Sequence, residues 1–275
     1  MSILDRYAVF GHPVAHSRSP WLHARFAELT GERLSYESRD VPPGGFDEAL
    51  AEFLHGGGKG LNITVPHKLA AYAAADHLTP RAQRAGAVNT LAVRPEGLLG
   101  DNTDGAGLLR DLEHNLGLAL DDMRILLVGA GGAARGALGP LLDAGPRELV
   151  IANRHADKAH ALAADFAADG NLSGVGLDEA HGPFSLVVNA TSASLHGEVP
   201  ALPEDTVDAG SFCYDMAYGS GPTSFMRWAA TKGAAGSADG IGMLVEQAAE
   251  SFALWRGVRP PTAQPLAALK RLAHG

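Results

Sequence analysis

The chain has 275 residues, of which 46% are hydrophobic and 19% charged, and its formal net charge is −9. This length and apolar content support one large or two modest folded domains and exclude a disulfide-held miniature protein or a wholly disordered chain. The negative charge repels polyanions at long range, so no nucleic-acid-binding surface is expected.

The sequence carries no signal for export or membrane insertion. Its N-terminus lacks a basic region followed by an apolar run, and no stretch of about 18 uninterrupted apolar residues occurs. The single cysteine, Cys213, cannot form an internal disulfide, which fits a reducing compartment. We therefore expect a cytoplasmic protein that does not contact a membrane.

Short apolar runs alternate with segments of helical period along the chain. This alternation is typical of βα units and predicts an α/β fold. The expected strands are residues 6–10, 35–40, 60–64, 90–94, 124–128, 148–152, 184–189 and 211–214.

Two features indicate more than one domain. A new strand, glycine turn and helix begin at Arg124, so we place a boundary near residues 101–105, with Thr103 as the N-cap of the helix that follows. The stretch 233–240 is rich in Gly, Ala and Ser, and it is the candidate for the second boundary, where the chain returns to the first domain. The expected division is 1–103, 104–239 and 240–275.

The strand 124–128 leads directly into a glycine-rich segment, Gly129-Ala130-Gly131-Gly132-Ala133-Ala134. This order fits the dinucleotide-binding fingerprint, in which Gly129 permits a tight turn, Gly131 allows backbone to approach a pyrophosphate, and Ala134 lets the helix pack closely. Free N–H groups at the helix start would then face the phosphates. A plain strand-to-helix turn can also have this pattern, so the glycines alone are weak support.

The residues after the next strand, 148–152, indicate which dinucleotide is bound. Proteins specific for NAD commonly carry an acidic residue here, which accepts from the ribose 2′-hydroxyl. This chain has Asn153 and Arg154 instead, with Lys158 one helical turn later. A guanidinium can bind a 2′-phosphate through two hydrogen bonds, so NADP is preferred. Stray cations at a solvated helix start remain the alternative.

The segment after the first strand contains the pair Ser17 and Ser19, followed by Pro20. Ser19 is expected as an N-cap, with proline at the first helical position. Two serines at a helix start can present hydroxyl and N–H groups to a carboxylate. Capping alone would also account for Ser19.

Taken together, several separated segments closely resemble shikimate dehydrogenase over nearly the whole chain. They stand in the family's order and are far more specific than the glycine loop alone. They are residues 11–20, 58–68, 85–90, 100–105, 189–192, 214–218 and 238–248.

The resemblance implies an α/β enzyme with an N-terminal substrate domain, a Rossmann-type NADP-binding domain, and C-terminal helices that return to the first domain. It implies reversible reduction of 3-dehydroshikimate to shikimate by NADPH, in the chorismate pathway of aromatic amino acid biosynthesis. It also implies roles for matching residues. Those expected to bind the substrate are Ser17 and Ser19 for the carboxylate, Tyr218 near it, and Asn62, Thr64, Asn89, Asp104 and Gln247 for the ring hydroxyls. Those expected at the cofactor are Gly129, Ala130, Gly131, Gly132 and Ala133 for the pyrophosphate, Asn153, Arg154, His155 and Lys158 for the adenosine phosphate, and Thr191, Met216, Gly240 and Met243 for the nicotinamide.

By the same resemblance, Lys68 and Asp104 form the catalytic acid/base pair. The chemistry supports this, because hydride delivery to a ketone creates an alkoxide that needs a proton donor beside it. Each residue also has a plainer interpretation, Lys68 as a solvated lysine at a helix start and Asp104 as an acid favoured by the helix dipole. The sequence alone does not show whether the two side chains lie close together.

Three rival functions remain. A quinate/shikimate dehydrogenase that uses NAD is disfavoured by Ser19 and Arg154, and a catalytically silent NADP- or sugar-acid-binding protein by the retention of both Lys68 and Asp104. A methylene-tetrahydrofolate dehydrogenase would not explain the paired serines.

The remaining expectations concern metals, assembly and two departures from the family pattern. The twelve histidines show no convincing metal-binding spacing, so no metal is expected. We expect a monomer or homodimer whose partner is a small-molecule substrate. Family members often have an acid where this chain has Pro80, and a glycine where it has Ser194, which leaves the local loop geometry open.

Overall fold

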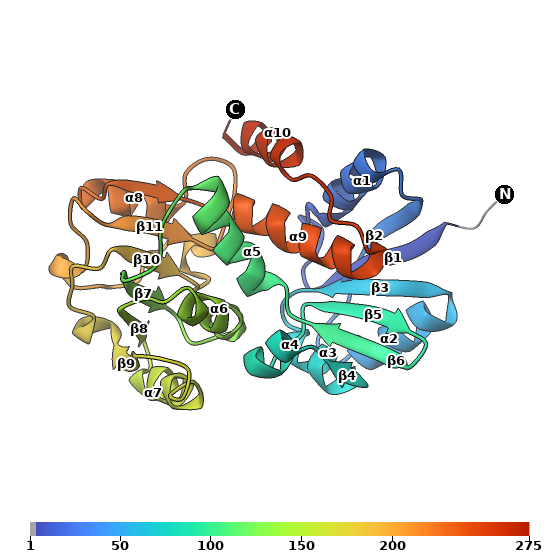
Figure 1. Ribbon diagram of the computed structural model, residues 1–275, viewed down its shortest axis with the longest axis horizontal. Coiled ribbons are helices and arrows are strands. Elements are labelled where there is room, and N and C mark those ends of the chain that lie inside the picture. Colours follow the sequence, from blue (N-terminus) through green and yellow to red (C-terminus); the bar gives the residue numbers. More distant parts are fainter. Residues whose placement is uncertain (1–3, 275) are drawn as a thin grey trace. The chain divides into compact units, whose positions relative to one another are not determined.

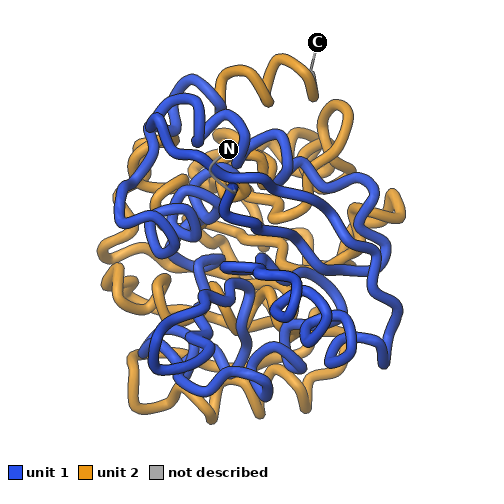
Figure 2. The backbone as a smooth tube through the Cα atoms, turned by 90° about the vertical axis from the view of Figure 1, so that its right-hand side faces the viewer, with its two compact units in different colours: residues 1–107, 245–265 blue, residues 108–244, 266–275 orange. Residues whose placement is uncertain are grey.

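The computed structural model describes residues 4–274 and has the expected α/β fold (Figure 1). The described residues fall into two compact units. Unit 1 contains those up to residue 107 and those of 245–265, and unit 2 contains those of 108–244 and from 266 onward (Figure 2). Across 4–274, no helix combines the length and apolarity that a membrane span requires.

The sheet of unit 1 is mixed, with the strand order β2-β1-β3-β5-β6-β4. Its strands are β1 (Asp5–Gly11), β2 (Leu34–Asp40), β3 (Gly58–Ile63), β4 (His77–Leu78), β5 (Thr90–Arg94) and β6 (Gly97–Asp101). β1 lies parallel to β2 and β3, whereas β5 is antiparallel to both β3 and β6. The register pairs Thr90 with Asn62 on one side and with Asp101 on the other, which gathers polar residues at one end of three strands.

Helices cover both faces of this sheet. They are α1 (Ser19–Thr30), α2 (Phe46–His55), α3 (Lys68–Ala74), α4 (Pro80–Ala85), the start of α5 (Asp104–Arg110) and the part of α9 (Ile241–Arg256) from residue 245 onward. Side chains alternate along β1, so Phe10 packs edge-on against Phe53 of α2, while Tyr7 stacks on Trp255 of α9. A Cβ at Gly60 would lie 2.4 Å from Trp255 Nε1. α9 can therefore pack this close to β3 only because residue 60 is a glycine.

The sheet of unit 2 is entirely parallel, with the order β12-β11-β10-β7-β8-β9. Its strands are β7 (Arg124–Val128), β8 (Glu148–Asn153), β9 (Leu172–Gly176), β10 (Leu186–Asn189), β11 (Phe212–Asp215) and β12 (Gly236–Ala238). This is the order of dinucleotide-binding folds, in which the chain reverses direction across the sheet between β7 and β10. In folds of this kind, ligands bind at the carboxyl ends of the strands where the strand order reverses.

Both faces of the parallel sheet are buried, as continuous apolar runs predict. Along β7, Ile125 and Leu127 enter one hydrophobic cluster, and Leu126 and Val128 enter another. The helices of unit 2 are α6 (Gly132–Asp143), α7 (Ala156–Asp165), α8 (Ser224–Thr231) and α10 (Ala263–His274), the last belonging to it from residue 266. The Gly221 N–H donates to the Ala273 carbonyl of α10 at 2.7 Å.

Four strands were missed by the sequence analysis, because they lack a long apolar run. β4 has only two residues, β9 contains two glycines, and β6 starts at a glycine with a φ of 132°. β12 occupies the small-residue stretch 233–240 that we had taken as a boundary. Ser19 is likewise not an N-cap: α1 already begins at Ser19, and Arg18 precedes it.

Candidate active site

Lys68 and Asp104 are the first residues of α3 and α5, and their side chains meet within unit 1. Lys68 Nζ donates to Asp104 Oδ2 at 2.5 Å, although the residues are 36 positions apart in the sequence. Their side chains are 19% and 10% exposed, so the pair is largely shielded but still reachable from solvent. The Val88 N–H donates to the Lys68 carbonyl at 3.0 Å, which ties the start of α3 to the loop before β5. The contact with the carboxylate therefore fixes the direction of the ammonium.

The second oxygen of the Asp104 carboxylate is held by Asn89. Asn89 Nδ2 donates to Asp104 Oδ1 at 2.8 Å and to Thr103 Oγ1 at 2.9 Å, while Asn89 Oδ1 accepts from the Thr103 N–H at 2.8 Å. The amide therefore satisfies turn backbone and also orients the carboxylate. Both roles follow from one side chain that is only 3% exposed.

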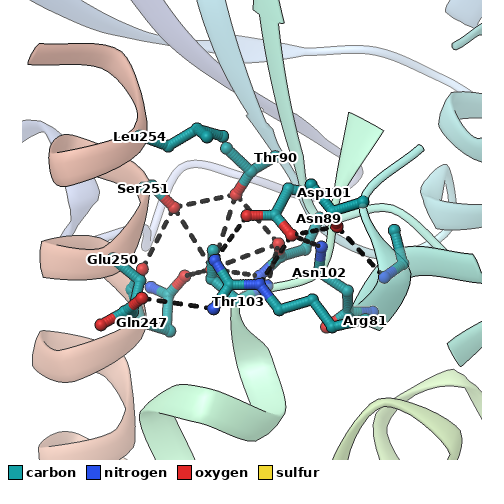
Figure 3. Close-up of polar contacts among 12 residues, drawn as sticks. Arg81, Asn89, Thr90, Asp101, Asn102, Thr103, Gln247, Glu250, Ser251 and Leu254 are labelled. Atoms are coloured by element: carbon teal, nitrogen blue, oxygen red, sulfur yellow. Dashed lines mark hydrogen bonds and ion pairs between the residues drawn. The ribbon is translucent and has the colours of Figure 1, made fainter. Parts of the chain in front are cut away.

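Asn62 lies in a buried polar network that joins β3, β5 and α9. Its Nδ2 donates to Ser251 Oγ at 2.9 Å and to Thr90 Oγ1 at 3.1 Å. Ser251 Oγ is in turn 2.8 Å from Thr90 Oγ1 and 3.2 Å from Thr103 Oγ1 (Figure 3). A hydrogen-bonded chain thus runs from Lys68 through Asp104, Asn89 and Thr90 to Asn62.

Sequence reasoning missed Tyr36 and Ser251, which extend this network. The Tyr36 hydroxyl donates to Asn62 Oδ1 at 2.8 Å, and burial raises the pKa of Tyr36 well above its ordinary value, so the phenol stays protonated. Each of these two residues could have been noticed in the sequence. Tyr36 is an aromatic in an otherwise polar strand, and Ser251 is a polar residue on the apolar stripe of α9, three positions after Ala248.

The other expected substrate residues occupy different places in the two units. Ser17 and Ser19 lie at the start of α1, where the Ser17 hydroxyl accepts from the Ser19 N–H at 3.3 Å. Thr64 follows β3, and its N–H donates to the Phe10 carbonyl. Gln247 lies on α9, with Oε1 3.4 Å from Thr103 Oγ1. Tyr218 belongs to unit 2, half-buried after β11.

In unit 2 the glycine-rich segment forms a tight turn that leads into α6. Gly129 has a φ of 116°, which favours glycine, and a Cβ there would lie 3.2 Å from Thr191 Cγ2. At Gly131 and Gly132 a Cβ would meet no atom within 4 Å, so the backbone at the start of α6 is open. The flanking Ala130 and Ala133 are half-buried, and Ala134 is fully buried. The open N-terminus of α6 fits a dinucleotide phosphate.

The segment after β8 presents cations without local partners. Arg154 and Lys158 are exposed, and no ion pair joins either of them to another described residue. Asn153 Nδ2 donates to the carbonyl of His155, which is the N-cap of α7. Asp157 in the first turn offsets part of this positive charge, and the exposed guanidinium of Arg154 suits the 2′-phosphate of NADP.

Of the four residues expected at the nicotinamide, Thr191, Met216 and Gly240 follow the carboxyl ends of β10, β11 and β12, and Met243 lies in the first turn of α9. Thr191 Oγ1 donates to Asn189 Oδ1 at 2.7 Å, which fixes the loop after β10. A Cβ at Gly240 would lie 2.2 Å from the Met216 carbonyl oxygen, so only glycine permits that approach. The Met243 N–H donates to the Tyr214 hydroxyl, which itself donates to Asp111 Oδ2 at 2.7 Å.

The two departures from the family pattern have local explanations. Pro80 starts α4 directly after Thr79, whose hydroxyl caps the helix, and the next residue, Arg81, binds both oxygens of the buried Asp101 (Figure 3). The Ser194 hydroxyl donates to Asp215 Oδ2 at 2.6 Å and so secures the loop after β10. In the described part of the chain, no group of three His, Cys, Asp or Glu side chains is placed to hold a metal ion.

Three family models match parts of this chain. Residues 9–91 match the family model of the shikimate dehydrogenase substrate binding domain, residues 111–196 that of shikimate / quinate 5-dehydrogenase, and residues 240–270 that of the shikimate 5′-dehydrogenase C-terminal domain.

Individual relatives cover nearly the whole chain. Shikimate dehydrogenase (NADP(+)) of Alkalilimnicola ehrlichii is 56% identical over 266 residues, covering 97% of this chain and 98% of the relative. The enzyme of the same name from Aromatoleum aromaticum is 56% identical over 276 residues, covering 99% of each. The crystal structure of shikimate 5-dehydrogenase from Thermus thermophilus in complex with NADP(H) and shikimate is 37% identical, with a TM-score of 0.88 and coverage of 98% and 99%. The resemblance seen in the motifs is confirmed, and this chain belongs to the shikimate dehydrogenase family.

Proposed function

We propose that this chain is an NADP-dependent shikimate dehydrogenase, which reversibly reduces 3-dehydroshikimate to shikimate in the chorismate pathway. The observation that carries the proposal is the ion pair of Lys68 and Asp104, buried beside a network of hydroxyl and amide groups. A polyhydroxylated ring needs such convergent groups, and a site built around them penalises analogues that lack a hydroxyl.

Residues of unit 1 hold the substrate. Ser17 and Ser19 hold the carboxylate with hydroxyl and N–H groups at the start of α1. Asn62, Thr64, Asn89, Asp104 and Gln247 bind the ring hydroxyls. In this assignment residues 1–103 form the substrate domain and 104–239 the cofactor domain. Of the helices that follow, α9 from residue 245 returns to unit 1, whereas α10 from residue 266 belongs to unit 2.

In the reductive direction the ketone carbon gains a hydride and its oxygen gains a proton. NADPH, when bound, supplies the hydride. The Lys68 ammonium donates the proton to the oxygen as negative charge develops on it, and Asp104 stabilises the ammonium before transfer. In the oxidative direction the neutral amine of Lys68 takes the hydroxyl proton back. Asn89 keeps the carboxylate in place throughout, because it holds the oxygen that Lys68 does not use.

The cofactor is held by backbone and cations of unit 2. Residues 129–133 receive the pyrophosphate, Asn153 to Lys158 receive the adenosine and its phosphate, and Thr191, Met216, Gly240 and Met243 surround the nicotinamide. No metal is required, because the ammonium performs the electrophilic role. We further infer that the enzyme works in the cytoplasm as a monomer or homodimer.

An absorbance assay at the nicotinamide wavelength tests the function. Shikimate and quinate are each offered with NADP and with NAD. The expected result is efficient turnover only for shikimate with NADP. Preference for quinate with NAD would instead favour the quinate/shikimate dehydrogenase, and binding of NADP and shikimate without turnover would favour a silent binding protein.

A further inference from the structure

This inference rests on the proposed function, which assigns Asn62 to a ring hydroxyl of the substrate. The Tyr36 hydroxyl donates to Asn62 Oδ1 at 2.8 Å. Tyr36 lies on β2 and Asn62 on β3, so this contact reaches across the intervening strand β1.

On its nitrogen side, the Asn62 amide has a long 3.5 Å contact with the Asn89 carbonyl oxygen and shorter contacts with two hydroxyls. Those hydroxyls, of Thr90 and Ser251, can both donate and accept, so they alone do not determine which end of the amide faces them. Tyr36 supplies the directed contact at the other end, because its hydroxyl donates to Asn62 Oδ1 at 2.8 Å. One lone pair of Oδ1 then stays available to a ligand hydroxyl.

The Tyr36 ring is itself held by His23 of α1. The two rings are stacked, with centroids 4.3 Å apart and planes 6° apart. His23 is fully buried, and burial lowers its pKa to about 3, so the ring is neutral. Neither ring nitrogen has a hydrogen-bond partner among the described residues, and Phe26 and Trp255 flank the ring. A neutral, unpartnered imidazole acts here as a flat packing surface.

We propose that Tyr36 is a positioning residue for substrate binding, kept flat by His23, which orients the Asn62 amide so that it accepts a substrate hydroxyl. Because Tyr36 acts through Asn62 and not on the transferring proton, its contribution is the same in the ground state and the transition state. It therefore sets KM for shikimate rather than turnover.

Tyr36→Phe removes only the hydroxyl and keeps the stacked ring. The expected result is a KM for shikimate raised about 5- to 10-fold, the effect of one lost hydrogen bond, with kcat within about twofold and KM for NADP unchanged. Tyr7→Phe is the matched control, since Tyr7 is the register partner of Tyr36 on β1 and its hydroxyl contacts Arg256 instead. It should leave KM for shikimate unchanged.

Two further comparisons separate positioning from mere packing. In an Asn62→Ala background, Tyr36→Phe should have no further effect on KM, whereas an unchanged, additive effect there would overturn the proposal. His23→Phe, which keeps a flat ring, should stay within about twofold of the unaltered KM, and His23→Leu should raise it as Tyr36→Phe does.

The outcomes distinguish this inference from the proposed function. If the unaltered chain turns over shikimate but Tyr36→Phe changes only its melting temperature, this inference alone is wrong. If the unaltered chain does not turn over shikimate, the proposed function fails, and the inference fails with it.

Discussion

The Lys68 ammonium and the Asp104 carboxylate form a 2.5 Å ion pair between the first residues of two helices. The dipole of α5 favours an acid at its first position, whereas that of α3 opposes a cation there. The carboxylate offsets this penalty and keeps the ammonium directed. The pair is thus arranged to hold a proton donor at a helix end where a cation alone would be unfavourable.

Lys68→Ala should lower kcat by about 10²- to 10⁴-fold, the usual contribution of a positioned general acid, with a much smaller change in KM for shikimate. Steady-state kinetics with NADP measure both constants. Lys59→Ala is the control, because Lys59 is exposed on the neighbouring strand β3. An unchanged kcat in Lys68→Ala would remove Lys68 from the chemistry.

Arg154→Ala should weaken NADPH binding far more than NADH binding, because only NADPH carries the 2′-phosphate. Dissociation constants for both cofactors, measured by fluorescence titration, give the ratio. Arg147→Ala changes an exposed arginine just before the other end of β8 and should affect neither cofactor. Equal losses for NADPH and NADH in Arg154→Ala would contradict the phosphate assignment.

The two glycines at the phosphate loop should respond differently to alanine. Gly131→Ala should weaken NADP binding while the free energy of unfolding of the unliganded protein stays within about 0.5 kcal/mol, because a Cβ there meets no protein atom. Gly129→Ala should lower that free energy by about 1 kcal/mol or more, because its φ of 116° disfavours an L side chain. Urea unfolding and NADP titration together test the pair. Tight NADP binding by Gly131→Ala would show that the phosphates lie elsewhere.

Buried His23 should make the folded state sensitive to acid. Its pKa is about 3 in the folded state, against 6.5 for an unburied histidine, so the unfolded chain binds an extra proton below pH 6.5. The free energy of unfolding should therefore fall as pH decreases from 6.5 toward 3, by about 3 kcal/mol at pH 4.5 from this group alone.

Urea unfolding at pH 7 and pH 4.5 measures this loss. His23→Phe keeps the ring but cannot titrate, so its loss between the two pH values should be smaller by that amount. Identical losses in the two proteins would mean that His23 does not titrate as its burial implies.

The sequence determined the features that depend on near neighbours. The glycine loop, the cations after β8 and the two serines at the start of α1 each lie within a few residues, so their spacing in the sequence is enough to predict their chemistry. The buried strands of unit 2 could also be predicted, because a parallel sheet that is buried on both faces has strands made of continuous apolar runs. Strands with small or polar residues, such as β9 and β12, gave no such signal.

Only the tertiary structure decided the contacts around the candidate site. Lys68 meets Asp104, Ser251 meets Asn62 across 189 positions, and Tyr36 reaches Asn62 from another strand. These hydrogen bonds depend on strand register and on the return of α9 to unit 1. Neither is encoded by local propensity, because a shift of one residue in register would turn the same side chains to the opposite face.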